Sequence, residues 1–130
     1  MVKKKPDATK DTLLHYLKKN QKKNKSTAFI RKENGTLKSE LNYQLLKSLD
    51  NYYLLEVLPK TGRHHQIRVQ LSKIGSPIKG DIKYGADRTN KDSSIHLHAR
   101  KIEFIHPVKK ESISITAPPP KKDAIWKACL

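Results

Sequence analysis

The amino-acid sequence predicts an α+β fold that is mainly antiparallel sheet with a few short helices. Residues 37–46 alternate between apolar and polar side chains, which is typical of a strand with one buried face. Residues 52–58 form a second, more apolar run after a turn, so the two segments predict an antiparallel hairpin. Between residues 61 and 75 the apolar positions change to helical spacing. Strands and helices that follow one another in blocks indicate the α+β class.

The chain before this hairpin is expected to contain a disordered start, a short helix and a strand. Residues 1–8 carry three consecutive lysines and a proline, which indicates a disordered basic start. Thr9 or Asp11 is a suitable N-cap for a helix, and residues 27–30 form an apolar strand candidate. The apolar positions of this helix are Leu13, Leu14 and Leu17.

A lysine-rich run at residues 18–25 follows the expected helix, and two interpretations have similar weight. Runs of this kind usually form a solvated face. The same run is also suited to be an arm that contacts the phosphates of a nucleic acid.

The expected hairpin begins after a turn at residues 33–35, where the sequence reads Glu-Asn-Gly. Its first strand places alternate residues on one buried face, and its second strand leads the chain into residue 61. The side chains of the buried face are Leu37, Leu41, Tyr43 and Leu45.

The expected helix after residue 61 is defined by Ile67, Leu71 and Ile74, and Gly75 ends it. The C-terminal part is expected to form a loop at residues 86–94 and an antiparallel pair of strands at residues 95–105 and 112–116. A short helix is expected at residues 123–130, with Trp126 packed on the core. No repeat or linker divides the 130 residues, so one domain or part of one is expected.

The composition is strongly basic, with 28 Lys and Arg residues against 12 Asp and Glu residues and a net charge of +16. Such a charge favours a polyanionic partner, and RNA is the first candidate. No apolar run has the length of a membrane-spanning helix, so no membrane association is expected. Cys129 is the only cysteine, which is consistent with a reducing cytoplasm.

The most specific part of the sequence is a pair of blocks, residues 61–71 and 75–85. Arg68 lies within the first turns of the expected helix, and its planar, permanently charged guanidinium suits a phosphate or a buried carboxylate. The two blocks closely resemble the signature of the RluA-type pseudouridine synthases, with Gln70 where that family usually has His. The matching residues are Thr61, Gly62, Arg63, His65, Gln66, Ile67, Arg68, Leu71, Gly75, Pro77, Ile78, Gly80, Asp81, Tyr84 and Gly85.

The resemblance implies catalytic roles for three residues and requires no cofactor. Tyr43 would lie against the target base and assist proton transfer, although a core position is the commoner role for a tyrosine on a strand. Ile67 would form a wall under the flipped uracil, and Arg68 would pair with the catalytic aspartate. Asp81 is expected to be a structural hydrogen-bond acceptor.

Six basic or polar side chains of the two blocks are assigned to structural hydrogen bonds or to contacts with RNA. They are Arg63, His64, His65, Gln66, Lys79 and Lys83. His96 and His98 are expected to alternate on a strand, but no cysteine or carboxylate pair completes a metal-binding set around them. No metal site is therefore expected.

The aspartate block that the resemblance implies for catalysis does not occur among the seven aspartates of the chain. We therefore expect residues 9–130 to be the C-terminal part of a pseudouridine synthase catalytic domain, a truncated isomerase that binds rRNA or tRNA but is inactive alone. Self-association is a further expected consequence of an exposed sheet edge. The alternative is a non-catalytic basic RNA-binding module.

Overall fold

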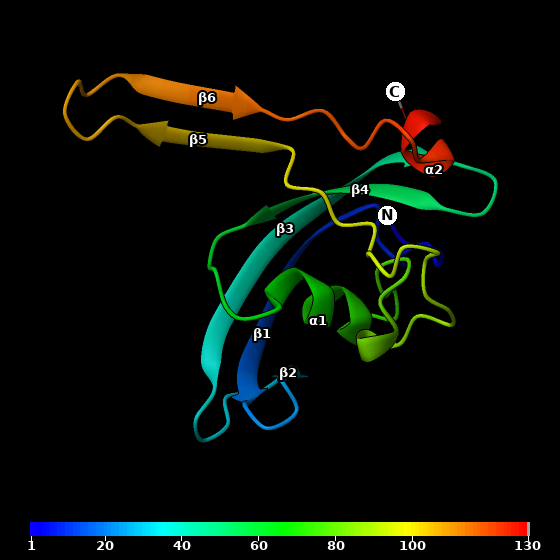
Figure 1. Cartoon of the computed structure of the whole chain (residues 1–130). Coiled ribbons are helices and arrows are strands. Elements are labelled where there is room, and N and C mark those ends of the chain that lie inside the picture. The colour runs from blue at the N-terminus through cyan, green and yellow to red at the C-terminus, as the bar shows by residue number, and fades with distance from the viewer. Residues whose placement is uncertain (130) are drawn as a thin grey trace. The chain divides into compact units, whose positions relative to one another are not determined.

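The computed structural model describes residues 1–129 and has the expected α+β architecture (Figure 1). The chain forms two compact units, Met1–His96 and Leu97–Leu130. Within residues 1–129 no helix is both long enough and apolar enough to cross a membrane.

The first unit is built on a four-stranded antiparallel sheet with the order β2-β1-β3-β4. A helix, α1, lies against one face of this sheet, and a single 3-10 turn, η1, follows it (Figure 1). The predicted hairpin and the predicted helix are both confirmed. The bounds are β1 Lys10–Asn20, β2 Lys25–Phe29, β3 Leu37–Ser48, β4 Tyr53–Pro59, α1 Gln66–Lys73 and η1 Ile82–Tyr84.

The core of the first unit lies between the sheet and α1 and consists of two clusters. Alternation along β1 and β3 places one set of apolar side chains on the face that α1 covers. The larger cluster contains Val2, Leu13, Leu41, Tyr43, Leu55, Leu71 and Ile78, and the smaller one contains Leu17, Ala28, Val69 and Tyr84.

The helix predicted after Thr9 or Asp11 is wrong, because this segment is strand β1. Leu13 and Leu17 are buried, whereas Leu14 between them is 42% exposed, so burial follows a period of two residues. Strands pair with β1 on both sides, and these ladders override the local helical pattern.

The expectation of a disordered start is wrong for Met1 and Val2. Val2 is fully buried, and its backbone exchanges two hydrogen bonds with Tyr53, at 3.0 and 2.8 Å. The apolar side chain of Val2 fills a place in the larger core cluster, so the chain is anchored before its lysines begin. Lys3, Lys4 and Lys5 are exposed.

The second unit contains one antiparallel pair, β5 (Lys101–Ile105) and β6 (Ser112–Thr116), and the short helix α2 (Ala124–Lys127). The strand predicted from residue 95 begins only at Lys101, because residues 95–100 make no ladder. The predicted terminal helix is confirmed for residues 124–127, and Leu130 lies outside the described residues.

Trp126 packs within the second unit. Its ring meets the edge of the His98 ring with 6.0 Å between the centroids. The Asp123 side chain caps α2 by accepting the N–H groups of Ile125 and Trp126. The expected packing of Trp126 on a core is matched by its burial, at 9% exposed.

Candidate active site

The loop that leads into α1 is fixed on β3 by Thr61 and Gln66. The Glu40 N–H donates to Thr61 Oγ1 at 3.0 Å, and Gln66 Nε2 donates to the Glu40 carbonyl at 3.0 Å. Gln66 Oε1 accepts from Thr61 Oγ1 at 2.8 Å and from the Arg63 N–H at 2.9 Å. These bonds determine where α1 begins, and the buried Gln66 has a structural role.

His65 precedes α1 in the left-handed conformation, with φ of 54°. Its Nδ1 is 2.7 Å from the Tyr84 hydroxyl, which itself accepts the Ser26 N–H at 2.9 Å. Burial lowers the pKa of His65 to about 4, and the nearby charges of Arg68, His64 and Lys83 act in the same direction. The imidazole is therefore neutral at pH 7, and its Nδ1 can accept the Tyr84 O–H.

His64 stacks on His65, with 3.7 Å between the ring centroids, and connects α1 to the β1–β2 turn. Its Nδ1 lies 2.9 Å from Ser26 Oγ, and its Nε2 lies 3.1 Å from Asn24 Oδ1. Lys83 donates to the Asn24 carbonyl at 3.0 Å. The tip of the β1–β2 hairpin is therefore fastened to both blocks of the motif.

Arg68 forms a bidentate ion pair with Asp81, which joins the two motif blocks. Arg68 Nε and Nη2 donate to Asp81 Oδ2 and Oδ1, both at 2.8 Å. The Arg68 guanidinium also lies 5.0 Å from the centre of the Tyr84 ring. The hydrogen bonds to Asp81 raise the pKa of Arg68 further, so this guanidinium keeps its charge.

Asp81 is only 1% exposed, and the ion pair occupies both of its carboxylate oxygens. A carboxylate held in this way is unsuited to attack a substrate, because attack requires an accessible oxygen. The predicted structural role of Asp81 as an acceptor agrees with this geometry. Within this chain, the ion-pair partner of Arg68 is therefore Asp81.

Tyr43 and Arg68 have different hydrogen-bond partners. The Tyr43 side chain is 3% exposed within the larger core cluster, and its hydroxyl donates to the Ala8 carbonyl at 2.8 Å. Burial raises the pKa of Tyr43, with smaller contributions from Asp11 and Asp7. Alternation along β3 directs Tyr43 to the covered face, where it is a core residue.

Tyr84 is the tyrosine beside Arg68, and the sequence analysis gave it no role. It lies inside the second motif block, so its fixed spacing from Arg68 was the available signal. Ile67 is half-buried and packs against the larger core cluster. Gln70, where the family usually has His, is fully buried, with Nε2 2.9 Å from His15 Nδ1.

Arg63 and Lys79, which were also predicted to contact RNA, differ in their exposure to solvent. Arg63 is exposed and donates through Nε to the Lys38 carbonyl at 3.1 Å. Lys79 is half-buried, donates to Asn90 Oδ1 and lies 5.5 Å from the centre of the Tyr52 ring. Within residues 1–129, no cluster of three or more His, Cys, Asp and Glu side chains is arranged to hold a metal ion.

His96 and His98 do not share a strand. His96 is buried in the first unit, where Asn90 Nδ2 lies 2.8 Å from its Nδ1. His98 belongs to the second unit, where its Nε2 lies 3.0 Å from the Ala117 carbonyl. Their predicted alternation on one strand is wrong, because the strand begins after both residues.

Sequence comparison relates the chain to RNA-modifying enzymes. A sequence profile described as RNA pseudouridylate synthase matches residues 1–73. The chain is 34% identical over 132 residues to a ribosomal large subunit pseudouridine synthase C from Buchnera aphidicola, which covers 96% of this chain and 40% of that protein. It is 38% identical over 73 residues to a tRNA pseudouridine synthase C from Haemophilus influenzae, with 51% of this chain and 30% of that protein covered.

Structure comparison gives the same fold. Human RNA pseudouridylate synthase domain containing 4 aligns with a TM-score of 0.74 at 22% identity, over 92% of this chain and 56% of that chain. Human RNA pseudouridylate synthase domain containing 1 aligns with a TM-score of 0.71 over 92% of this chain. The chain spans less than half the length of the curated relatives named above. It belongs to the RNA pseudouridylate synthase family, of the RluA type.

Proposed function

We propose that this chain is the C-terminal part of the catalytic domain of an RNA pseudouridine synthase. This part comprises residues 9–130 together with the buried Met1 and Val2. The reaction would be the isomerisation of uridine to pseudouridine in ribosomal or transfer RNA. The match of the family profile to more than half of the chain is the observation that carries this proposal. The names of the relatives refer to both classes of RNA, and the charge of +16 suits a polyanion.

The chemistry requires an acidic group in a defined electrostatic setting. The bond between ribose C1′ and uracil N1 must break, a bond between C1′ and C5 must form, and C5 must lose its proton while N1 gains one. A carboxylate that attacks the ribose or the base, or that accepts a proton, would serve these steps. The target uridine must also leave its stack, because its reacting atoms are otherwise covered by neighbouring bases.

Arg68 is the residue that we assign to hold this carboxylate in its ionised form. Its bonds to Asp81 use Nε and Nη2, so the donors on Nη1 are suited to a second acidic group. A guanidinium within hydrogen-bond distance keeps a carboxylate ionised by lowering its pKa. Asp81 and Tyr84 would act as positioning residues, because one anchors the Arg68 fork and the other lies against its face.

The attacking carboxylate would come from outside these 130 residues, because Asp81 is buried and paired and none of the seven aspartates lies in the aspartate block that the resemblance implies. Ile67 is the proposed apolar wall beneath the uracil, since it lies next to Arg68 at the start of α1 and is only half-buried. The catalytic role expected for Tyr43 has no support from its position in the core, so we do not retain it.

Release of tritium from RNA that contains 5-tritiated uridine tests the proposal. The chain alone should bind such ribosomal or transfer RNA without releasing tritium. A longer polypeptide that joins this chain to a segment with the family's aspartate block should release it. Tritium release by the chain alone would refute the need for an outside carboxylate. Absence of release from the longer polypeptide with both RNAs would favour the non-catalytic RNA-binding module.

We also propose a cytoplasmic location and a capacity for self-association. The single cysteine supports the first, because it forms no internal disulfide. Apolar side chains on β5 and β6 support the second, since Ile102 and Ile115 are paired across the strands and both are more than half exposed. Sedimentation of the chain at increasing concentration measures this association, and a constant monomer mass would rule it out.

A further inference from the structure

We propose that the sheet face opposite α1, at the β1–β2 hairpin, is a platform on which single-stranded RNA stacks its bases. This inference rests on the proposed function, because it assigns to the RNA substrate a second contact away from Arg68. The platform consists of Tyr16, Lys18, Asn20, Thr27, Phe29 and Lys38.

The strand register places these side chains on the solvent face. Leu13, His15 and Leu17 of β1 are buried beneath α1, so the residues between them face the other way. Directly paired residues share a face, so Phe29 of β2, Tyr16 of β1 and Lys38 of β3 form one row across the sheet. Two half-buried aromatic side chains thus lie on the face that α1 does not cover.

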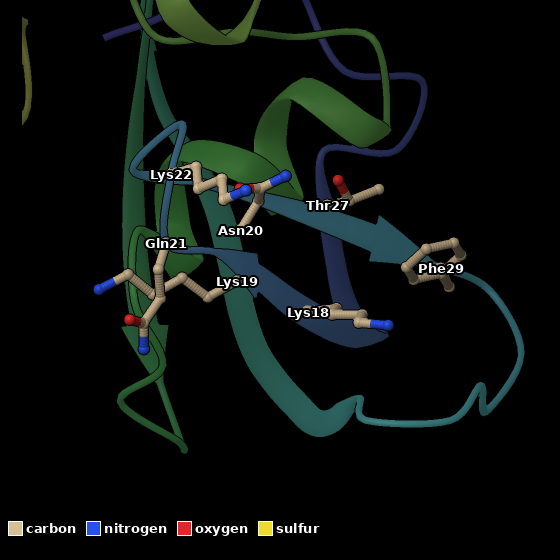
Figure 2. A pocket seen from close by; sticks show the side chains of 7 residues that line it. All are labelled: Lys18, Lys19, Asn20, Gln21, Lys22, Thr27 and Phe29. Carbon is tan, nitrogen blue, oxygen red and sulfur yellow. The ribbon is translucent and has the colours of Figure 1, made fainter.

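A hollow of about 440 Å³ opens on this hairpin (Figure 2). Lys18, Thr27 and Phe29 project from the two strands, and Gln21 and Lys22 project from the turn between them (Figure 2). The hollow therefore combines an aromatic ring with ammonium groups and amide side chains. Its complete lining is Lys18, Lys19, Asn20, Gln21, Lys22, Thr27 and Phe29.

The chemistry of the hollow favours single-stranded RNA over other polyanions. A lysine cluster alone would attract any acidic surface, but an aromatic ring beside it offers a flat partner for an unpaired base. Aromatic side chains on an open sheet face bind RNA in this way, since every base has a π-face. A paired base in a duplex keeps its faces covered, so a helix would use only the lysines.

The hairpin is also fixed relative to the motif. The Asn24 side chain at its tip is bound by His64, and the Asn24 carbonyl is bound by Lys83. His64 stacks on His65 at the start of α1, and Lys83 belongs to the motif block that the Arg68–Asp81 ion pair joins to α1. An RNA strand held on the hairpin would therefore be held at a constant distance from α1.

Fluorescence anisotropy with a labelled ten-nucleotide single-stranded RNA and with a duplex of equal charge tests the inference on the complete 130-residue chain. Phe29→Ala should weaken binding of the single strand about tenfold, and Phe29→Tyr should retain it. Phe104→Ala is the matched control, because Phe104 is also partly exposed but lies in the second unit. Thermal unfolding of each variant verifies that the fold is retained.

The lysines are tested separately through salt dependence. The double variant Lys18→Ala and Lys22→Ala should lower the slope of log affinity against log salt by about 1.4 for the single strand, if each lysine contacts one phosphate. The control is the double variant Lys121→Ala and Lys122→Ala, which removes the same charge from exposed positions in the second unit. We expect the salt-dependence slope to change less in this control than in the variant that lacks Lys18 and Lys22.

Equal affinities of Phe29→Ala and Phe104→Ala for the single strand would overturn the inference. Equal losses for single strand and duplex, or displacement of RNA by polyglutamate of the same charge, would also overturn it, because either result indicates charge alone. Tritium release by the longer polypeptide is measured in parallel. Normal release with unchanged binding would refute only the platform, and hairpin-dependent binding without release would refute only the isomerase.

Discussion

Arg68 and Asp81 join the two motif blocks through one partly buried ion pair. The carboxylate is buried, and its two bonds to a planar guanidinium compensate for the loss of water around both charges. The physical features of Arg68 that the sequence predicted, a fork directed at an acid, are present. The resemblance implied a catalytic aspartate as the partner of Arg68, and the partner within the chain is Asp81, because spacing along a sequence does not reveal which acid the fold brings close.

Replacing Arg68 should cost more stability than replacing an exposed arginine. Arg68→Ala leaves Asp81 charged and buried without its partner, so the free energy of unfolding should fall by about 3 kcal/mol. Arg88→Ala removes an exposed charge and should change it by less than about 0.5 kcal/mol. Urea unfolding at pH 7 measures both values, and similar values for the two variants would show that the ion pair contributes little.

The neutral histidine beside the ion pair predicts a pH dependence. The pKa of His65 is 6.5 when unfolded and about 4 when folded, so between these values the unfolded chain binds more protons. Stability should therefore rise with pH across this window, and should be lost as the pH falls through it. His64 and His15, whose pKa values burial also lowers, act in the same direction.

Urea midpoints between pH 4.5 and 7 measure this effect. The His65 contribution should be roughly 1–2 kcal/mol after allowance for solvent screening. His65→Gln should reduce the pH dependence without abolishing it, because the other two histidines remain. A variant whose midpoints follow the same pH profile as the parent would contradict the assignment of a neutral His65.

At the scale of elements, β1 was the main failure of sequence-based prediction and α1 the main success. Helix α1 has apolar residues at helical spacing and a glycine with φ of 89° just after its end, so local signals suffice. The β1 segment has an ambiguous apolar group at residues 13–17, and only its pairing with two other strands settles its conformation. The burial of Val2 also depends on distant residues and leaves no local signal.

Alanine substitutions distinguish a strand from a helix at this position. In the strand, Leu13 is 6% exposed and Leu14 is 42% exposed, so their contributions should differ. Leu13→Ala should lower the free energy of unfolding by about 3 kcal/mol, and Leu14→Ala by less than about 1 kcal/mol. An amphipathic helix would bury both residues on one stripe, so equal losses would contradict the strand.

At the scale of the whole molecule, the charge and the two motif blocks predicted the family, but not the division into two units. The fold class was correct, because it depends on element types that the sequence patterns reveal. For the site, the acceptor role expected for Asp81 agrees with its geometry, whereas Tyr43, for which a catalytic role was expected, is a core residue, and Tyr84 beside Arg68 was given no role. Side-chain direction at Tyr43 depends on which sheet face α1 covers, and that is a tertiary property.

The central claim is that Arg68 organises an acidic group for uridine isomerisation. The most direct measurement is single-turnover tritium release by the longer polypeptide carrying Arg68→Lys, with Arg88→Lys as the matched control. We expect the Arg68 variant to lose at least about a hundredfold in rate while its RNA affinity changes little, because lysine keeps the charge but not the fork. A rate equal to that of the Arg88 variant would contradict the claim.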